Sequence, residues 1–488
     1  MPDPTGEQAE AIAAYGDGTD LVLQAGAGCG KSSTLRMIAG SDRRRRMLYV
    51  AYNRSIAADA AKSFPANVTA KTGHGLAFDP KFLPRIQRPR QTALDAAKAL
   101  GVDRMLGGVQ RILTDHGDLK AMTSKVVMRC ALDTVAWFCH SADPELTSRH
   151  IPAYEGLKLP DARAELVDMV LPVAKLAWAD VLKGDGVLKL SHDHYLKLWA
   201  LGRPTIDTDV ILLDEAQDTN DVLSRVLLDQ EHAQRIAVGD SAQQIYEWRG
   251  AKDALTVFER ELGAETRTLS QSFRFGQPIA EEANRWLYLV GTELRLTGWE
   301  QCTSDVGPVT SPDAILCRTN AGAIGIVLEA LRAGRKVHLV GGGSEIKRLA
   351  WAAQSLQAGR ATDHPELLAF PSWEAVREYA EEEDGSLRVL VKLVDDHGPE
   401  ELITAADALA GETSAELVVS TAHKAKGREW PKVRIHGDFR QPKPDPATGE
   451  TRLRREEARL AYVAVTRARE HLDCDALAWV STVNAVSD

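Results

Sequence analysis

The segment 25–32, AGAGCGKS, constrains the fold of this chain more than any other, because its small residues let the backbone wrap closely around an anion. It follows an apolar run, Leu21 to Gln24, and opens a stretch, Ser32 to Ala39, whose apolar side chains recur at helical spacing. A strand, a glycine-rich turn and a helix in this order gather backbone N–H groups at the positive end of a helix. We therefore expect an α/β sheet with a phosphate-binding loop at its carboxyl edge.

The residues of this loop predict how a nucleotide would be held. Lys31 would reach the β- and γ-phosphates, and the Ser32 hydroxyl would hold Mg²⁺. Ala25 stands where the common G-x-x-x-x-G-K-[ST] pattern has its first glycine, and a glycine-rich turn that binds no nucleotide is the alternative. The residues expected around the phosphates are Gly26, Ala27, Gly28, Cys29, Gly30, Lys31, Ser32 and Ser33.

The segment 212–218, LLDEAQD, places two adjacent carboxylates at the end of another apolar strand. One carboxylate can hold the metal ion while the other polarises the attacking water. We assign Asp214 to Mg²⁺ and Glu215 to the general base. The alternative is an acid-rich helix N-terminus, which would use Asp218 or Asp221 just as readily.

Short apolar runs that end at polar or turn residues predict buried parallel strands in two groups. The first group is Leu21–Gln24, Met47–Tyr52, Val210–Leu213 and Arg235–Val238, and the second is Ala314–Cys317, Lys336–Val340, Leu417–Ser420 and Val433–His436. Two α/β domains, each with a mainly helical insertion, are the economical interpretation. We place the first domain at 1–78 and 206–275 with its insertion at 79–205, and the second at 276–346 and 413–488 with a shorter insertion at 347–412.

Composition limits the class of protein. The chain has 488 residues, of which 44% are hydrophobic and 26% charged, and it has neither a run long enough to span a bilayer nor a secretory signal, so we expect a cytoplasmic protein. The net charge of −10 argues against coating nucleic acid by bulk charge, so a basic track must be local. Lys81, Arg85, Arg88 and Arg90 are candidates for such a track, and a solvated basic face is the alternative.

The six cysteines are sparse and form no C-x-x-C pair, which predicts reduced thiols rather than a disulfide framework or a zinc module. Cys29 stands among the N–H groups of the phosphate loop. Those groups would favour its thiolate, so that alkylation would block nucleotide binding. The alternative for Cys29 is a passive small side chain.

The segment 239–251, GDSAQQIYEWRGA, joins an amide that can read a γ-phosphate to aromatic rings that can stack on unpaired bases. Gln243 supplies the amide, and Tyr246 and Trp248 supply the rings. On its own the segment could equally be a turn with buried aromatics. Positive charge for the γ-phosphate would come from Arg274, in LSQSFRF, and Arg467, in YVAVTRAR, although either could be a surface arginine.

In this order, the segments closely resemble those of the UvrD/Rep-like superfamily 1 DNA helicases, and within them the F-box DNA helicase branch. The resemblance rests on both α/β domains and implies two RecA-like P-loop NTPase motor domains. Besides the segments above, it rests on TGEQ (5–8), AYNR (51–54), TGH (72–74), QSFRFG (271–276), LCRTN (316–320), STAHKAKGREW (420–430) and YVAVTRARE (462–470).

The resemblance assigns roles on the nucleotide side. It implies that Gln8 contacts the adenine edge, that Phe273 stacks on the adenine and that Glu429 approaches the ribose. It implies further that Gln243 senses the γ-phosphate, with Arg274 and Arg467 as arginine fingers.

On the strand side the resemblance implies base stacking and phosphate contacts. The residues expected to bind DNA are Tyr52, Asn53, Thr72, His74, Tyr246, Trp248, Arg249, Thr421, His423 and Trp430. Three departures affect this side: Ala51 and Gly73 stand where relatives often have aromatic residues, and Arg428 replaces a usual leucine. The second insertion is short beside that of the long UvrD-type members, which suits the F-box branch, although no F-box segment is evident.

The resemblance implies an ATP-dependent DNA helicase or translocase that moves 3′ to 5′ on single-stranded DNA, with ATP and Mg²⁺ as cofactors. The alternatives are a motor that removes proteins from DNA with little unwinding, and an ATP-gated module that binds single strands without turnover. The expected partners are single-stranded DNA, single/double-strand junctions and proteins of repair, recombination or replication. We further expect a monomeric motor that, in a prokaryote, would be associated with the nucleoid.

Overall fold

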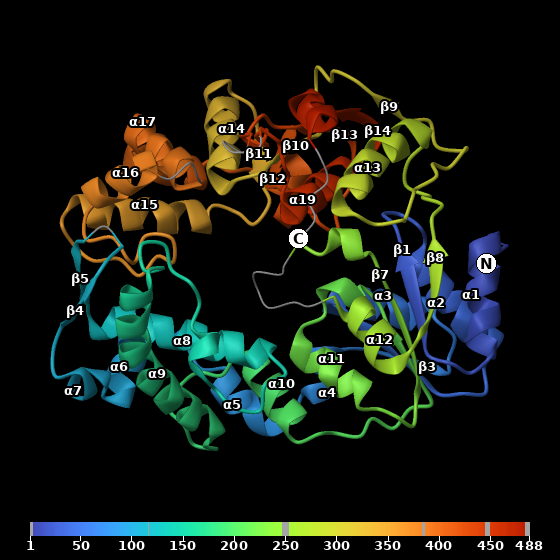
Figure 1. The fold of residues 1–488 in the computed structure, drawn as a ribbon, viewed down its shortest axis with the longest axis horizontal. Helices are drawn as coiled ribbons and strands as arrows, with labels where there is room; N and C mark the ends of the chain where they lie inside the picture. Colours follow the sequence, from blue (N-terminus) through green and yellow to red (C-terminus); the bar gives the residue numbers. More distant parts are fainter. Residues whose placement is uncertain (1–2, 116, 246–252, 383–385, 445–448, 484–488) are drawn as a thin grey trace. The chain divides into compact units, whose positions relative to one another are not determined.

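The computed structural model describes residues 3–115, 117–245, 253–382, 386–444 and 449–483. The chain divides into two compact units, each assembled from segments that are distant in sequence (Figure 1). The first unit comprises Met1–Gly73, Thr205–Gly341 and Leu409–Asp488, and the second comprises His74–Pro204 and Gly342–Ala408. The first unit therefore holds both α/β sheets, while the second joins the two insertions.

The first sheet contains, within the described residues, six parallel strands with β1 between β7 and β8. β1, β6 and β7 are almost wholly buried apolar runs, as expected for central strands covered on both faces. In spatial order the strands are β3 (Val68–Thr72), β2 (Met47–Ala51), β6 (Val210–Leu213), β7 (Gln234–Gly239), β1 (Leu21–Ala25) and β8 (Glu265–Leu269).

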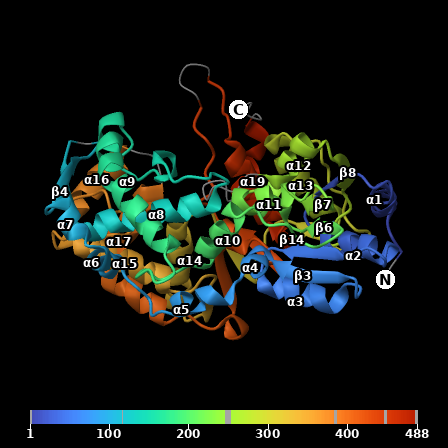
Figure 2. The same ribbon diagram turned by 90° about the horizontal axis from the view of Figure 1, so that it is seen from below.

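Helices cover both faces of this sheet. Right-handed crossovers put the helices that follow β1 and β2 on one face and those that follow β6 and β7 on the other. The first pair is α2 (Lys31–Ser41) and α3 (Arg54–Ser63), and the second is α11 (Asp221–Leu228) and α12 (Ala254–Leu262), as Figure 2 shows. α1 (Gly6–Gly16) packs beside β8.

The helix after the phosphate loop follows the predicted pattern. Leu35, Ile38 and Ala39 form its buried face and are fully buried. The helix α2 runs two residues past the expected stretch Ser32–Ala39 and includes Gly40, the residue from which the sequence would predict the helix end.

The second sheet also contains six parallel strands within the described residues. In spatial order they are β11 (Val337–Leu339), β12 (Leu417–Thr421), β10 (Ala314–Cys317), β13 (Trp430–Ile435), β14 (Ala468–Asp473) and β9 (Asp305–Val306). α14 (Asn320–Arg332) crosses from β10 to β11, and α18 (Ala422–Ala425) follows β12. α13 (Gln277–Val290) packs against α19 (Arg455–Val465). The α/β class expected from the sequence is confirmed.

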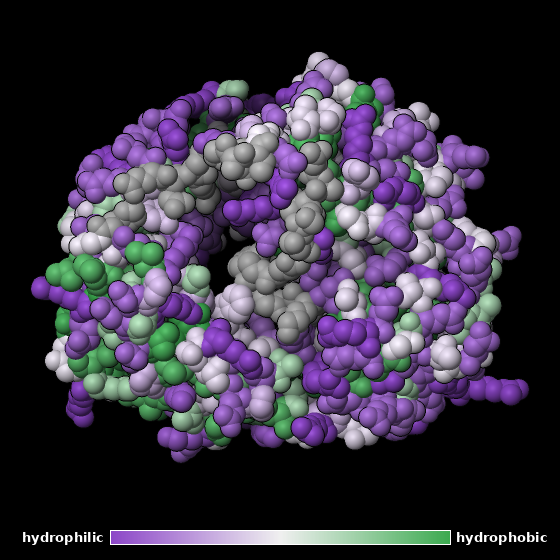
Figure 3. Space-filling view, in the orientation of Figure 1, coloured by the Kyte–Doolittle hydropathy of each residue, from purple (hydrophilic) through white to green (hydrophobic). Residues whose placement is uncertain are grey.

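The second unit is mainly helical. Its helices are α4 (Gly73–Ala77), α5 (Leu83–Ile86), α6 (Ala93–Leu100), α7 (Val102–Leu106), α8 (Ser124–His140), α9 (Pro160–Leu182), α10 (His192–Leu201), α15 (Ser344–Gln357), α16 (Trp373–Glu382) and α17 (Ser386–Asp407), the first of which begins in the other unit. An antiparallel pair, β4 (Gln110–Leu113) and β5 (Leu119–Met122), completes it. In Figure 3, apolar side chains gather over α6, α7 and the β4–β5 pair, where Met105, Val109 and Leu119 are exposed.

The two insertions share one core. Leu368 and Ala369 of the second insertion are buried in the cluster formed by α8 and α9. The buried Lys120 ammonium donates to the Phe370 carbonyl, and the Tyr379 hydroxyl donates to Glu155 at 2.9 Å. The two insertions are separated in sequence by more than a hundred residues of the first unit, yet they pack into one compact body. No helix in the described ranges is long and apolar enough to cross a bilayer.

Arg85, which the sequence placed on a candidate phosphate track, belongs to the core of this unit. Only 4% of it is exposed, and its guanidinium donates to the Asp180 carboxylate at 2.8 Å and to the carbonyls of Lys183 and Leu188. Arg88 likewise donates to the Gly186 carbonyl. The prediction that Arg85 belongs to a phosphate-binding track is therefore wrong. The local sequence gives no sign that this side chain is buried.

We predict that Arg85→Ala destabilises the insertion unit by about 3–5 kcal/mol, because it leaves the Asp180 carboxylate buried without its partner. Arg90→Ala, at an exposed position of the same segment, is the matched control and should change stability by less than about 0.5 kcal/mol. Urea denaturation followed by circular dichroism measures both. Equal, small effects of the two variants would contradict the structural role of Arg85.

Candidate functional site

The phosphate loop is shaped by glycines that no other residue could replace. Gly28 has φ +77°, and a Cβ there would lie 2.6 Å from the Ser272 hydroxyl oxygen. Gly30, with φ +74°, begins α2 beside the ring of Phe273. Ala25 ends β1 in ordinary strand geometry, so the alanine at the usual glycine position is tolerated. The loop therefore forms a cradle in which small residues keep backbone N–H groups accessible to an anion.

The two carboxylates at the end of β6 have different partners, which fit different chemical roles. The Asp214 carboxylate accepts from the Ser32 hydroxyl at 2.6 Å and from the Tyr49 hydroxyl at 2.5 Å. Glu215 has φ +50°, a left-handed conformation that is rare outside glycine, and its carboxylate contacts Lys31 and Gln217. The oxygens of Ser32 and Asp214 are ligands of the kind that Mg²⁺ prefers, so this pair fits the metal expected from the sequence.

Lys31 and Glu215 form an ion pair at the mouth of the loop. The Lys31 ammonium lies 2.9 Å from the Glu215 carboxylate, which also accepts from the Gln217 amide at 2.7 Å. Burial by itself raises the pKa of Glu215, but Lys31 and Lys426 outweigh it and hold that pKa well below its usual range. Burial also raises the pKa of Asp214, and the charge of Glu215 adds to this effect. Glu215 is therefore ionised and can accept a proton.

Gln243 is held inside the site by its neighbours. It lies in a short 3₁₀ helix, Ser241–Gln243, and its amide donates to the Asp240 carboxylate at 2.7 Å. Asp240 is fully buried, and its backbone N–H donates to Gln217 at 3.0 Å. Burial raises the pKa of Asp240, while Lys31 opposes that rise.

Both predicted arginine fingers lie at this site. Arg467 is 1% exposed, and its guanidinium donates to the Gln243 side-chain oxygen at 3.4 Å. Burial, together with the charge of Arg274, lowers the pKa of Arg467 to about 9, so its guanidinium remains charged at neutral pH. Arg274 donates to Glu429 at 2.7 Å and to the Thr466 carbonyl at 3.1 Å.

One cavity of about 640 Å³ gathers the residues expected around the phosphates. Its walls come from the phosphate loop, from the ends of β6 and β7, and from segments of the second sheet. Predicted residues that line it include Lys31, Ser32, Glu215, Gln243, Arg274 and Arg467. Residues from both sheets thus converge on a single space, as the sequence predicts.

A second cavity, of about 740 Å³, holds the residues expected near adenine and ribose. Phe273 and Glu429 line it, and Arg274 lines both cavities. The Phe273 ring meets Trp299 edge-on, with centroids 5.7 Å apart. Gln8 lies close by, where its amide donates to the Thr34 hydroxyl at 3.2 Å and its carbonyl oxygen accepts from the Thr5 N–H. Gln8 therefore also caps the start of α1.

An ion pair that the sequence did not predict closes the first cavity. The Lys426 ammonium lies 2.6 Å from the Asp218 carboxylate and donates to the Gln243 carbonyl. Burial raises the pKa of Asp218 to about 6, against the opposing charge of Lys426. Both residues stand inside segments used for the resemblance, but their pairing joins positions 208 apart and leaves no local signal.

Two of the predicted strand contacts lie at the nucleotide cavity. Tyr52 and Asn53 both line the first cavity. Tyr52 is 52% exposed, and the Asn53 side chain caps α3 by accepting from the Ile56 N–H at 2.9 Å. A side chain at position 73 would require Leu223 to shift, because a Cβ there would lie 2.5 Å from a δ-carbon of Leu223.

The other predicted strand contacts are scattered. Thr72 ends β3, whereas His74 begins the second unit and lies 2.9 Å from Asp193 of that unit. Thr421 is buried and caps α18, the short helix that contains His423. Tyr246, Trp248 and Arg249 lie outside the described residues.

Trp430 is 9% exposed and belongs to the hydrophobic core of the first unit. Its backbone N–H donates to the Arg467 carbonyl at 3.0 Å. Its contact with a base stays a prediction.

The structure favours the passive alternative for Cys29. It is 2% exposed, and burial, reinforced by the charge of Asp240, raises the pKa of its thiol far above the usual range. Lys31 opposes this effect but does not outweigh it. Cys29 is therefore a passive small side chain, and all six cysteines are free thiols as predicted.

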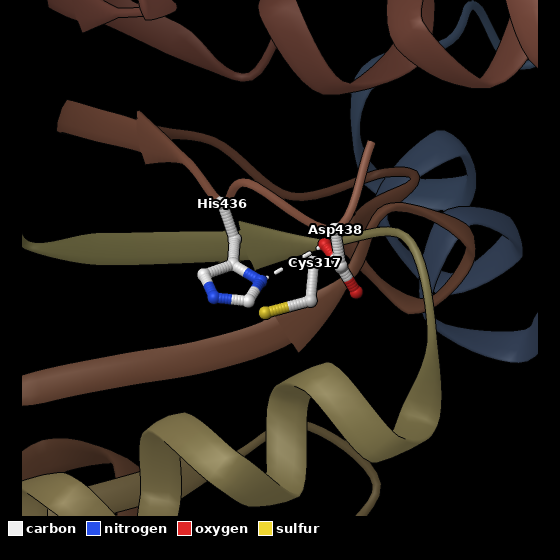
Figure 4. A group of neighbouring side chains, drawn as sticks. All are labelled: Cys317, His436 and Asp438. Carbon is white, nitrogen blue, oxygen red and sulfur yellow. Dashed lines mark ion pairs between the residues drawn. The ribbon is translucent and has the colours of Figure 1, made fainter. Parts of the chain in front are cut away.

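Cys317, His436 and Asp438 form a group at the carboxyl edge of the second sheet, with all three potential ligand atoms within 4.8 Å of one another (Figure 4). The Asp438 carboxylate lies 3.0 Å from His436 and accepts the N–H groups of Arg318 at 2.8 Å and Thr319 at 2.9 Å. Burial raises the pKa of the Cys317 thiol well above its usual value. These contacts explain the group as the support for the start of α14.

Comparisons with known proteins agree with this geometry. Residues 8–249 match the family model described as an AAA domain, and residues 375–475 match the UvrD-like helicase C-terminal domain. The F-box DNA helicase protein 1 of Schizosaccharomyces pombe is 29% identical over 500 residues, which cover 93% of this chain and 55% of that protein. The F-box DNA helicase 1 of Gallus gallus is 28% identical over 512 residues, which cover 93% of this chain and 47% of that protein.

A shorter match is to the DNA helicase II of Haemophilus influenzae, which is 39% identical over 77 residues, or 15% of this chain and 11% of that protein. The chain spans about half the length of the two F-box DNA helicases that it matches. Those two matches extend over both sheets and both insertions, whereas the shorter one covers a single region.

We predict that iodoacetamide at pH 8 alkylates Cys302 at least about tenfold faster than Cys29 in the folded protein, because only Cys302 is partly exposed and the Cys29 thiol is held neutral. Peptide mass spectrometry measures both rates. In 8 M urea, the two rates should converge. Similar rates in the folded protein would contradict the burial of Cys29.

Proposed function

Because the chain belongs to the UvrD-like helicases, we propose that it is an ATP-dependent motor that moves 3′ to 5′ on single-stranded DNA and couples ATP hydrolysis to duplex unwinding. The first cavity supports this proposal most strongly. It brings the phosphate loop, Glu215 and two arginines from outside the phosphate-loop segment into one space, and Asp214 contacts Ser32 of its lining. Such a set is what phosphoryl transfer to water needs.

The acidic pair divides the chemistry. Glu215 is ionised, held beside Lys31 and turned into the cavity by its left-handed backbone, so it would orient the attacking water and accept its proton. Ser32 and Asp214 would hold Mg²⁺, whose charge helps to neutralise the phosphates. Lys31 would exchange its partner Glu215 for the β- and γ-phosphates of ATP.

The γ-phosphate would also be contacted by three residues of the first cavity that lie outside the phosphate loop, Gln243, Arg274 and Arg467. Gln243 and Arg467 already contact one another, and Arg274 lines the same wall. Cations placed where the transferred phosphoryl group develops charge stabilise the transition state. Arg274 also spans the second cavity, where Phe273 and Glu429 would bind adenine and ribose, so one residue would report on both ends of the nucleotide.

Strand binding would be coupled through the segment that follows Gln243. The chain runs from this γ-phosphate reader directly into residues 246–249, where the sequence predicts base-stacking rings. A movement of Gln243 on hydrolysis would therefore shift the adjoining base contacts. Arrangements of this kind convert a local change at a phosphate into movement of a neighbouring segment.

We predict that Lys31→Ala or Glu215→Gln lowers DNA-stimulated ATP hydrolysis at least about 100-fold, because each variant removes a group placed at the reacting atoms. The matched controls are Lys62→Ala and Glu10→Gln, exposed positions of the same unit, which should hydrolyse ATP at the unaltered rate. Phosphate release is measured with and without single-stranded DNA, and circular dichroism checks the fold. Turnover retained by both site variants would rule out this assignment.

We predict that partial duplexes with a 3′ single-stranded tail are unwound and that those with a 5′ tail are not, because the strand would pass the motor in one direction only. A fluorescence strand-separation assay measures both, with release of streptavidin from a biotinylated end as a parallel readout. Preference for the 5′ tail would overturn the polarity. Streptavidin release without strand separation would replace unwinding by protein displacement.

A further inference from the structure

Tyr462 of α19 lies at the centre of the first unit, although neither the phosphates nor a strand is expected to touch it. Its side chain is fully buried. Its hydroxyl oxygen accepts the backbone N–H of Ala27, in the phosphate loop, at 3.0 Å. The same hydroxyl donates to the Asp240 carboxylate at 2.9 Å. One side chain from the helix before β14 therefore bridges two segments of the first sheet.

Both partners of Tyr462 need this hydroxyl. Ala27 and Asp240 are fully buried, so neither the N–H nor the carboxylate can turn to solvent instead. A hydroxyl can accept one hydrogen bond while donating another, and phenylalanine can do neither. Burial and the charge of Asp240 raise the pKa of Tyr462 well above its usual value, so the O–H remains available to donate.

Through Asp240, the contacts of Tyr462 extend to Gln243, the residue expected to sense the γ-phosphate. The oxygen of Asp240 that receives the Tyr462 hydroxyl also receives the Gln243 amide at 2.7 Å. Gln243 in turn accepts from Arg467, which lies two residues past the end of α19 and donates to the Val463 carbonyl of that helix at 2.9 Å. The contacts therefore form a closed circuit that leaves α19 at Tyr462 and returns to it through Arg467 and Val463.

The far side of the phosphate loop is held as firmly. The Ser272 hydroxyl donates to the Ala27 carbonyl at 2.8 Å, and the Phe273 N–H donates to the Gly28 carbonyl at 2.9 Å. Both polar groups of the Ala27 backbone are thus engaged by side chains, the N–H by Tyr462 and the carbonyl by Ser272. A shift of the loop must therefore move at least one of these two side chains.

We propose that Tyr462 is a positioning residue for hydrolysis, which ties the conformation of the phosphate loop to the placement of Gln243 through Asp240. This inference rests on the proposed ATPase activity and deepens it. Tyr462 would not bind the nucleotide itself. Its removal should therefore affect the chemical step, which needs Gln243 in place, more than the affinity for ATP.

The first test is Tyr462→Phe, with Tyr15→Phe as the matched control. Tyr15 is also buried in the first unit, and its hydroxyl also donates to a carboxylate, that of Asp42 at 3.1 Å, but it does not line either cavity. We expect Tyr462→Phe to lower the DNA-stimulated kcat about tenfold, with KM for ATP changed less than about threefold. Tyr15→Phe should keep the unaltered kcat, and thermal unfolding compares the stability of both variants.

A double-mutant cycle with Gln243→Ala gives a readout that a merely structural role would not move. If Tyr462 acts through Gln243, then in the Gln243→Ala background Tyr462→Phe should change kcat by less than about twofold. An undiminished tenfold loss in that background would show that Tyr462 acts independently of Gln243 and would overturn the proposal. An unaltered kcat in the single variant, or a rise in KM alone, would overturn it as well.

The failure of the proposed function is distinguishable from these outcomes. If the unaltered protein hydrolyses no ATP in the presence of single-stranded DNA, the ATPase assignment falls, and the role of Tyr462 falls with it. If the unaltered protein hydrolyses ATP and Tyr462→Phe does so equally well, only the role of Tyr462 is overturned.

Discussion

The packing of the first unit depends on how it buries charged side chains at the nucleotide site. Removing an ionised group from water costs several kcal/mol of folding free energy unless the group is paired and hydrogen-bonded. Two buried cations at the site are accordingly paired with carboxylates, Lys31 with Glu215 and Lys426 with Asp218. The buried Arg467 donates to neutral oxygens instead. The left-handed backbone of Glu215 is tolerated because it completes the pairing with Lys31. The ion pair with Lys31 thus offsets the backbone strain at Glu215.

Because the Lys426–Asp218 pair joins segments of both sheets, the charge balance of the site and the packing of the unit depend on each other. Lys426 and Arg467 approach from the second sheet, while Asp218 and Gln243 belong to the first. An anion bound at the phosphate loop would compete with Glu215 for Lys31 and so change the balance of charge across the contact. This physical link supports a mechanism in which nucleotide state and the relation of the two sheets depend on each other.

The sequence predicts the central strands and the parts of the site that come from compact motifs. All eight expected strands exist, because strands covered on both faces must be apolar runs. The strands β3, β8, β9 and β14 and the β4–β5 pair were missed, since segments such as VTAKT in β3 and AREHLD in β14 contain polar residues and form no apolar run. The burial of Arg85 and Trp430 was not predicted, because burial depends on contacts between distant segments. The domain limits and the strand-binding residues stay predictions.

If Gln243 connects the phosphate site to the strand, as proposed, nucleotide binding and strand binding are thermodynamically coupled. Equilibrium titration of a non-hydrolysable ATP analogue, with and without saturating single-stranded DNA, tests this coupling without requiring turnover. We expect DNA to change the Kd of the analogue at least about fivefold, and the analogue to change the Kd of the DNA by the same factor. Two tight but mutually independent binding events would contradict it.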